Sequence, residues 1–334
     1  MRFIQVGVGG FGRRWAEALA GSDEAEVVAL VDTSEKALAA CREKHGYPEG
    51  ICHQALESAL EEVEADALVC VVPPQLHRRI SCAAMEAGLD VITEKPMAGS
   101  IQDCRAMLEC AERTGRTCAV SQNYRYRPET WTMAELVRRG EIGAVGQVRL
   151  DFFMGVDFGG GFRHEMDYPL LVDMSIHHFD LIRFITGLDA LGAAGWSWNP
   201  PWSNYRGDAS CSVLFEMTGG ARALYSGSWC SKGRFGDWNG NWHIEGELGT
   251  ITSSGGDIRI HRASKLYEVE EVVEVEATAP SPEGQGFVLH DFVRAVEAGE
   301  RPATDLADNF GSIGMVFAAV EAVRSGARAE IPGR

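Results

Sequence analysis

A lysine and an aspartate–histidine pair are the side chains whose types and spacing could do chemistry in this chain. Lys95 follows Glu94 in the stretch VITEKPMAG, at the end of the apolar run DVIT. A lysine there can donate to a substrate hydroxyl and favour its ionisation, and partial burial would lower its own pKa. The alternative is a surface Glu–Lys pair at a turn, which is the commoner meaning of an isolated E-K-P.

Asp173 and His177 are four residues apart in DMSIHHFD, so a helix would place them on one face. A carboxylate at that spacing can hold the imidazole, or relay its proton, while the other ring nitrogen faces a substrate. His178 would point about 100° away around the helix and is not expected to share the role. An ordinary polar helix face or a capping network is the alternative. Asp173 and His177 supply only two ligands, so no metal is predicted.

A glycine motif indicates a nucleotide. Gly7-Val8-Gly9-Gly10-Phe11-Gly12 matches G-x-G-x-x-G between a predicted strand and a predicted helix. The glycines allow a tight turn and close approach of a pyrophosphate, and the following helix offers free N–H groups to that anion. The motif alone is weak, but this context is the one it requires. A glycine turn in a fold that binds no nucleotide is the alternative.

The end of the second predicted strand favours NAD over NADP. Asp32 lies 20 residues after Gly12, where an acid would bind the ribose 2′-hydroxyl. The same carboxylate would repel a 2′-phosphate, and the stretch VDTSEK offers no arginine just after it.

The elements that must position these residues alternate over the first ~120 residues, as in βαβ units on a parallel sheet. The predicted strands are near-continuous apolar runs, which indicates a sheet covered on both faces. The predicted strands are 2–9, 27–32, 66–74, 90–96 and 117–124, and the predicted helices are 13–21, 34–46, 76–88 and 100–115. Thr33 or Ser34 is the predicted N-cap of the second helix, and Gly46 its stop.

The pattern changes after Tyr124. A helix (133–143), an alternating strand (146–158), a glycine-rich loop (158–167) and a helix (170–187) precede a region of strands and turns, with a hairpin around Thr218-Gly219-Gly220. Helices 290–300 and 309–325 close the chain. The predicted fold class is therefore α/β, with a Rossmann dinucleotide-binding domain over 1–122 and an α+β substrate domain with a largely antiparallel sheet over 123–334.

Composition excludes several classes of protein. The chain has 334 residues, is 45% hydrophobic and 24% charged, and carries a formal net charge of −17. That charge argues against non-specific binding to nucleic acid or anionic membrane. No run approaches the ~20 apolar residues of a membrane span, and the N-terminus does not resemble a signal peptide. Nine cysteines without a C-x-x-C indicate reduced thiols in a cytoplasmic protein.

Together the Gly7–Gly12 motif, Glu94-Lys95-Pro96 and Asp173-x-x-x-His177 resemble the glucose–fructose oxidoreductase and inositol dehydrogenase family (Gfo/Idh/MocA) in order and spacing along the whole chain. The resemblance implies a Rossmann domain, a C-terminal α/β domain whose open sheet commonly forms a dimer interface, and redox chemistry on sugars or cyclitols. A homodimer or homotetramer is therefore expected.

Residue by residue, the resemblance implies that Lys95 is the catalytic lysine, His177 the general base and Asp173 its orienting or relay partner. Lys95 would stabilise an alkoxide while hydride leaves the same carbon for NAD. Arg125, in NYRYRP, would contact substrate, and the VVPPQLH turn would border the cofactor, although it matches the family pattern more loosely. The expected cofactor contacts are Gly7, Gly9, Gly10, Phe11, Gly12, Asp32, Thr33, Pro73, Pro74, His77, Glu94 and Lys95.

The substrate stays open at this point. Six of the eight tryptophans lie between Trp196 and Trp242 and could grip a sugar ring or form core and interface. The loop FGGGFRHEMD could deliver Asp157, Arg163 or His164 to a substrate, or could simply be mobile. Two alternatives to a dehydrogenase are also open: a redox-neutral glycoside hydrolase that uses tightly held NAD, and a non-enzymatic NAD-binding regulator.

Overall fold

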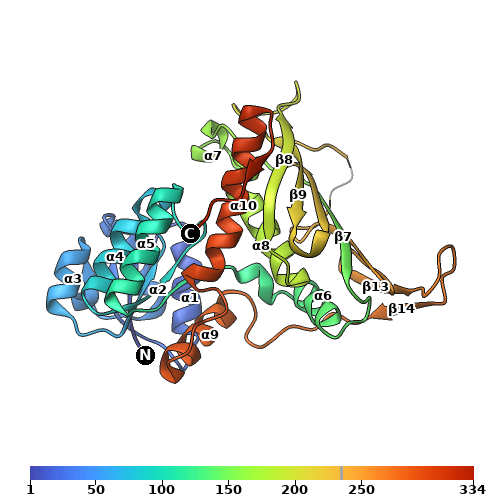
Figure 1. The fold of residues 1–334 in the computed structure, drawn as a ribbon. Helices are drawn as coiled ribbons and strands as arrows, with labels where there is room; N and C mark the ends of the chain where they lie inside the picture. Colours follow the sequence, from blue (N-terminus) through green and yellow to red (C-terminus); the bar gives the residue numbers. More distant parts are fainter. Residues whose placement is uncertain (234–235) are drawn as a thin grey trace. The chain divides into compact units, whose positions relative to one another are not determined.

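The chain divides into two units in the computed structural model, which describes residues 1–233 and 236–334 (Figure 1). The first unit comprises Met1–Asn123 and Ser281–Phe310, with Arg334, and the second comprises Tyr124–Pro280 and Gly311–Gly333. The predicted boundary after residue 122 lies within one residue of the first division. The predicted extent of the second domain differs, because 30 residues near the C-terminus, Ser281–Phe310, group with the first unit.

Packing explains that difference. Helix α9 (Gln285–Ala298) places the Phe292 ring 6.4 Å from the ring of Phe3 in the first strand, and both are fully buried. Further along, the N–H of Val120 donates to the carbonyl of Thr304 at 2.8 Å. The helical period shows that α9 has an apolar face, but it does not show which of two cores receives that face.

The first unit is a parallel sheet of the dinucleotide-binding type. Its strand order is β3-β2-β1-β4-β5-β6, and the order reverses between β1 and β4. Helix α4 packs with α5, and α1 packs with α2 and α9. The strands are β1 (Arg2–Val6), β2 (Glu26–Val31), β3 (Cys52–His53), β4 (Ala67–Cys70), β5 (Asp90–Thr93) and β6 (Cys118–Val120). The other helices are α1 (Gly12–Ala20), α2 (Glu35–His45), η1 (Glu49–Ile51), α3 (Leu56–Glu62), α4 (Pro74–Glu86) and α5 (Ile101–Thr114).

Local sequence sets the ends of these helices. The Ser34 hydroxyl accepts from the N–H of Ala37 at the start of α2, and Gly46 ends it at φ 71°. Both assignments confirm the prediction, with Ser34 rather than Thr33 as the cap. Ser100 and Gly115 do the same for α5. Each cap satisfies N–H or C=O groups that a helix end leaves without an intrahelical partner.

The second unit is built on a nine-stranded sheet in the order β14-β13-β12-β11-β7-β10-β9-β8-β15. All neighbours are antiparallel except β7 and β10, which run parallel with Leu150 opposite Tyr225. The predicted hairpin is confirmed: β9 and β10 meet at Thr218–Gly220, where Gly219 has φ 69°. The strands are β7 (Val145–Phe153), β8 (Ala190–Trp198), β9 (Ser210–Met217), β10 (Arg222–Ser228), β11 (Asn241–Gly246), β12 (Gly249–Ser254), β13 (Asp257–Arg262), β14 (Glu271–Val275) and β15 (Ala329–Glu330).

Helix α8 covers one face of this sheet. Its Phe179 packs edge-on against Phe215 and Tyr225, with ring centroids 4.7 and 5.2 Å apart. The opposite face exposes Leu214 and Leu224, which are paired in register. Beside the sheet lie η2 (Asn123–Tyr126), α6 (Pro128–Arg138), α7 (Phe162–Glu165), the π-helical turn η3 (Leu170–Met174), α8 (Ser175–Thr186) and α10 (Leu306–Ser325).

Helix α10 is the one helix in the described part of the chain that is long and apolar enough to cross a membrane. Its best 18-residue window has a mean hydropathy of 1.3, and 61% of that window is buried inside the protein. A mostly buried apolar helix is what the core of a globular protein contains.

Candidate functional site

The glycine turn after β1 has the shape of a phosphate cradle. Gly7 has φ 85°, and a Cβ there would lie 2.1 Å from the carbonyl oxygen of Val71. A Cβ on Gly12 would lie 2.1 Å from the carbonyl of Gly7, so both positions require glycine. At Gly9 a Cβ would meet only Ala37 Cβ and an Asp32 oxygen, both at 3.8 Å. The space beside Gly9 therefore fits a group that approaches the backbone, as a pyrophosphate does.

Two side chains hold this turn. The buried Gln5 amide donates to the carbonyls of Gly7 (3.0 Å) and Gly12 (2.7 Å). Asp32 accepts from the N–H groups of Val8 and Ser34, at 3.0 and 2.9 Å. The predicted acid thus lies at the mouth of the turn, next to the exposed Thr33, and the residues present fit a dinucleotide. Gln5 is missed by sequence reasoning, although a glutamine inside an apolar strand is an available signal.

Lys95 lies two residues after the end of β5 and is half-buried, at the same carboxyl edge of the sheet as the glycine turn. Glu94 is buried, and its carboxylate accepts from Trp15 Nε1 at 2.7 Å and from the Lys95 N–H at 3.0 Å. Burial raises the pKa of Glu94, against the opposing effect of the Trp15 hydrogen bond. Glu94, predicted as a cofactor contact, therefore joins the lysine turn to α1.

His77, another predicted cofactor contact, also lies against groups of the protein itself. Its imidazole is fully buried on α4, with Nδ1 2.9 Å from the carbonyl of Pro96 and Nε2 2.8 Å from that of Val72. Burial lowers the pKa of His77, so the ring is neutral near pH 7 and donates to one of these carbonyls. The His77 ring thus lies between the turn after β4 and the turn after β5 and holds them together. Pro73 and Pro74 cap α4 at the more accessible side of the same turn.

In the second unit, Asp173 and His177 lie on either side of a helical irregularity. Asp173 is in the π-helical turn η3, and His177 is in the first turn of α8. π-Helical turns are rare and occur frequently at functional sites. Asp173 Oδ2 accepts from Arg163 Nε at 2.5 Å. The prediction of one continuous α-helix over 170–187 is therefore wrong in detail. The spacing of its apolar residues does not show that the first turn is π-helical.

His177 is buried in a stack of planar groups. Its ring lies 4.0 Å from the ring of Tyr124 at an interplanar angle of 12°, and the Arg127 guanidinium lies 3.3 Å from the Tyr124 centroid. Arg127 in turn donates to Asn239 at 2.8 Å. Such packing fixes the plane of the imidazole. Tyr124 and Arg127 are residues that sequence reasoning misses.

Two nearby residues have buried partners within the protein. His178 is fully buried, with Nδ1 3.1 Å from the Tyr225 hydroxyl, and burial lowers its pKa to about 4. Arg125, predicted to contact substrate, is only 4% exposed and forms two hydrogen bonds with Asp180, at 2.6 and 2.5 Å. Ser312 also donates to Asp180 at 2.7 Å. Arg125 is thereby tied to α8, and the Ser312 bond links the same carboxylate to α10, while contact of Arg125 with a substrate stays a prediction.

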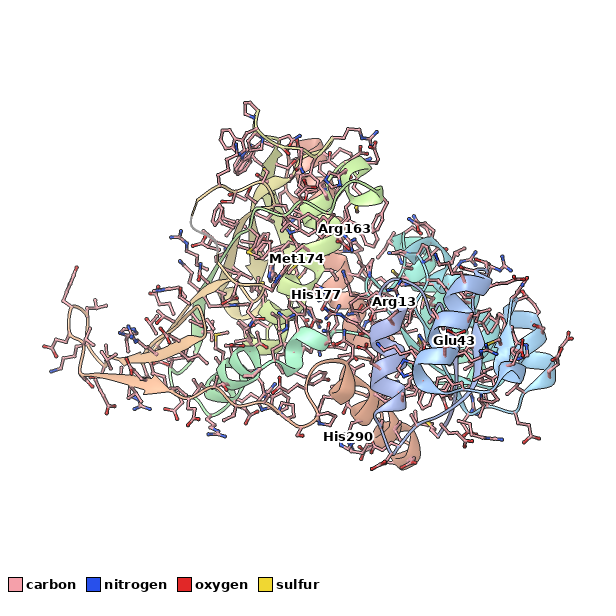
Figure 2. All side chains as sticks on the ribbon, turned by 180° about the vertical axis from the view of Figure 1, so that it is seen from behind. Arg13, Glu43, Arg163, Met174, His177 and His290 are labelled. Carbon is pink, nitrogen blue, oxygen red and sulfur yellow. The ribbon has the colours of Figure 1, made fainter. Side chains whose placement is uncertain are left out.

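The glycine-rich loop contains the other predicted contacts. The Asp157 carboxylate lies 3.5 Å from His164 Nε2, and the His164 ring stacks on Tyr205 with centroids 4.8 Å apart. Burial and the nearby Asp157 raise the pKa of Tyr205 to about 12. The loop thus packs on the segment that follows β8. Figure 2 labels Arg163, Met174 and His177 along one part of the second unit.

The tryptophans divide between core and surface. Trp229 and Trp242 are buried, whereas Trp196, Trp198 and Trp202 are exposed. Trp202 Nε1 donates to the carbonyl of Cys230 at 2.9 Å. Cys230 in turn bridges Gly155, just before the glycine-rich loop.

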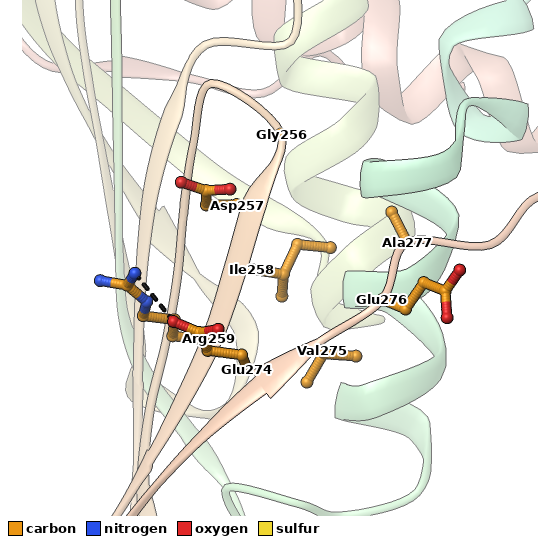
Figure 3. Close-up of a pocket in the computed structure, with 8 residues that line it drawn as sticks. All are labelled: Gly256, Asp257, Ile258, Arg259, Glu274, Val275, Glu276 and Ala277. Atoms are coloured by element: carbon orange, nitrogen blue, oxygen red, sulfur yellow. Dashed lines mark hydrogen bonds and ion pairs between the residues drawn. The ribbon is translucent and has the colours of Figure 1, made fainter.

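Other hollows lie apart from these residues within each unit. One of about 340 Å³ lies where β13 meets β14 and is crossed by an Arg259–Glu274 ion pair of 3.0 Å (Figure 3). Another, of about 820 Å³, lies beside α1 and α9 and contains a His290–Glu24 pair of 2.9 Å. Over residues 1–233 and 236–334, no group of three or more His, Cys, Asp or Glu side chains could hold a metal ion.

The comparisons with known proteins agree with this architecture. Residues 1–122 match the oxidoreductase family with an NAD-binding Rossmann fold, and residues 130–252 match the GFO/IDH/MocA C-terminal domain. The y4oX protein of Sinorhizobium fredii is 30% identical over 97% of this chain and 94% of its own length. The chain belongs to the GFO/IDH/MocA family. It is therefore an oxidoreductase with an NAD-binding Rossmann domain, and the predicted family and fold class are confirmed.

Other members of the family extend the comparison. Inositol 2-dehydrogenase of Rhizobium meliloti is 24% identical over 97% of both chains. D-Apiose dehydrogenase of Paraburkholderia graminis is 27% identical over 68% of this chain and 60% of its own. An oxidoreductase from Agrobacterium radiobacter, solved with NAD⁺, L-tartaric acid and magnesium, has the same fold with a TM-score of 0.90 at 20% identity, covering 99% of this chain and 98% of its own.

Proposed function

We propose that this protein is an NAD-dependent dehydrogenase that oxidises a secondary hydroxyl of a sugar-like or polyol substrate. The observation that carries the proposal is the open cradle at Gly9, with Asp32 at its mouth and Lys95 along the same carboxyl edge of the sheet. The names of relatives that act on inositol and D-apiose support a polyhydroxy substrate. NAD, when bound, supplies the hydride acceptor.

The chain's own residues supply alignment and proton chemistry. His177, held in its plane by Tyr124, takes the hydroxyl proton of the substrate. Lys95, held by Glu94, places a positive charge where the alkoxide forms. Asp173, which also pairs with Arg163, orients His177 or relays its proton. Asp32 favours NAD because a 2′-phosphate beside its carboxylate would be repelled.

The assay follows nicotinamide absorbance with NAD and, separately, NADP across cyclitols, aldoses, sugar acids and glycosides. We expect growth of NADH, preferred over NADPH, which Lys95→Ala and His177→Ala each lower by about 100-fold or more. Lys44→Ala, which changes an exposed lysine paired with Glu17, is the matched control and should leave the rate unchanged.

Other outcomes identify the other functions. Release of an aglycone without net NADH would indicate the redox-neutral hydrolase. Cofactor binding without turnover of any kind would indicate a regulator. An equal rate with NADP would contradict the role of Asp32.

A further inference from the structure

Arg163 contacts two aromatic rings in addition to its ion pair with Asp173. Its guanidinium carbon lies 4.7 Å from the ring centroids of both Phe158 and Phe162. Its Nε donates to Asp173 Oδ2 at 2.5 Å. Two aromatic contacts and one fixed hydrogen bond determine the plane and the rotation of the guanidinium before any ligand arrives.

A buried arginine–aspartate pair in the same unit gives a useful contrast. Arg125 uses both Nε and Nη2 on the two oxygens of Asp180, and the pair is almost completely buried. Arg163 uses Nε alone toward Asp173, and its side chain is 32% exposed. No described residue accepts a hydrogen bond from its Nη1 or Nη2, so the outer edge of a pre-oriented guanidinium is left for another acceptor.

That edge is suited to an anion. Two parallel N–H bonds from one guanidinium match the two oxygens of a carboxylate. The acids of the same loop have other partners: Asp157 accepts from the N–H of Gly159 and lies beside His164, and Asp167 pairs with Arg206 at 3.0 Å. A dianionic phosphate would be repelled more strongly than a carboxylate by Asp173, which contacts the same guanidinium.

We propose that Arg163 binds a carboxylate of the substrate, so that the enzyme acts on an acidic sugar or polyol, an aldonate or a uronate, in preference to its neutral counterpart. The proposal rests on the proposed dehydrogenase function. Arg163 pairs with the residue four positions before His177, and both lie on one part of the second unit (Figure 2). One short ligand with a carboxylate at one end and a reacting hydroxyl further along suits that arrangement.

The test compares substrates that differ in one group. D-Gluconate and D-glucitol form one pair, D-glucuronate and D-glucose another, and D-glucose 6-phosphate supplies the phosphate. We expect kcat/KM for at least one acid to exceed that of its neutral partner by about 10-fold or more. Arg163→Gln should lower kcat/KM for the acid about 10- to 100-fold, chiefly through KM, as loss of a charge-assisted pair predicts. The neutral partner should change much less.

Two further variants separate charge from loop structure. Arg206→Gln removes an exposed arginine from the same region and should leave the acid-to-neutral ratio unchanged. Arg163→Lys keeps the charge but lacks the fork, and an intermediate ratio is expected. A neutral substrate used as well as its acid, a phosphate preferred over the carboxylate, or a ratio that Arg163→Gln does not change would each overturn the proposal.

Calorimetric titration with D-gluconate and D-glucuronate keeps this test independent of turnover. If no compound yields NADH, the proposed function fails, yet acid binding by the wild type that Arg163→Gln abolishes would still support the carboxylate site. Absence of acid binding, or equal binding by both proteins, would overturn it whatever the turnover assay shows.

Discussion

At the scale of single residues, the fully buried histidine next to the proposed base should make the stability of the protein depend on pH. His178 lies against Phe152 and Tyr225 and is held by the carbonyl of Trp238. Burial, aided by the positive charge of Arg127, lowers its pKa from 6.5 to about 4. The folded protein therefore keeps this ring neutral at a pH where the unfolded chain would bind a proton.

The resulting pH dependence has a definite sign. Stability from this group is complete above the unfolded pKa, near 6.5, and is lost as the pH falls toward 4, because the unfolded state gains the proton first. The free energy of unfolding should fall by up to about 3 kcal/mol over that window. Denaturant titrations between about pH 7 and about pH 4 measure it.

Two histidine variants provide the control for that measurement. His178→Gln should remove most of the slope, while His243→Gln, at an exposed ring of β11, should leave it intact. A slope that survives His178→Gln would assign the acid sensitivity to other groups.

At the scale of elements, Trp15 connects α1 to the lysine turn. Its indole N–H donates to the buried carboxylate of Glu94, so the helix that begins at the glycine turn is tied to the strand that ends at Lys95. Losing this donor leaves a buried acceptor oxygen without it, which costs about 1–3 kcal/mol.

Trp15→Phe should therefore lower stability and also loosen the cofactor cradle. We expect Kd for NAD to rise about 3- to 10-fold, measured by calorimetry. Trp242→Phe is the matched control: it removes a buried indole bond to the carbonyl of Asn239 in the second unit, at 2.8 Å. It should lower Tm comparably and leave NAD affinity unchanged. Equal NAD affinity in both variants would contradict the role given to Trp15.

The sequence predicts elements well where a local rule fixes them. The Ser34 and Gly46 ends of α2 and the Gly7–Gly12 turn follow from backbone chemistry within a few residues. The π-helical turn at Asp173 is not predicted, because one altered turn hardly changes the spacing of the apolar residues. The pairing of Arg125 with Asp180 and of His77 with two backbone carbonyls is not predicted either, because a charged or polar residue type does not reveal which partner the fold brings to it.

At the scale of the whole molecule, one face of the nine-stranded sheet exposes a row of apolar side chains. Leu214 and Leu224 are opposite each other on β9 and β10 and are 41% and 38% exposed, while Ala194 of β8 extends the same row. A row of apolar side chains at the centre of an open sheet is a typical subunit interface. We therefore propose that two copies of the chain associate through this face.

The double variant Leu214→Glu/Leu224→Glu tests that association. Burying four carboxylates in such an interface would favour the monomer. The two glutamates also face each other on β9 and β10 of one chain, which costs some sheet stability, so each single variant, Leu214→Glu and Leu224→Glu, is measured beside the double variant. Light scattering with size-exclusion chromatography should show the mass falling to 36.4 kDa, with the circular dichroism spectrum unchanged. Leu266→Glu, in the exposed loop between β13 and β14, is the control and should keep the wild-type mass. If Leu266→Glu dissociates the protein and the double variant does not, the contact belongs to that loop and the sheet face is solvent-exposed in the assembly.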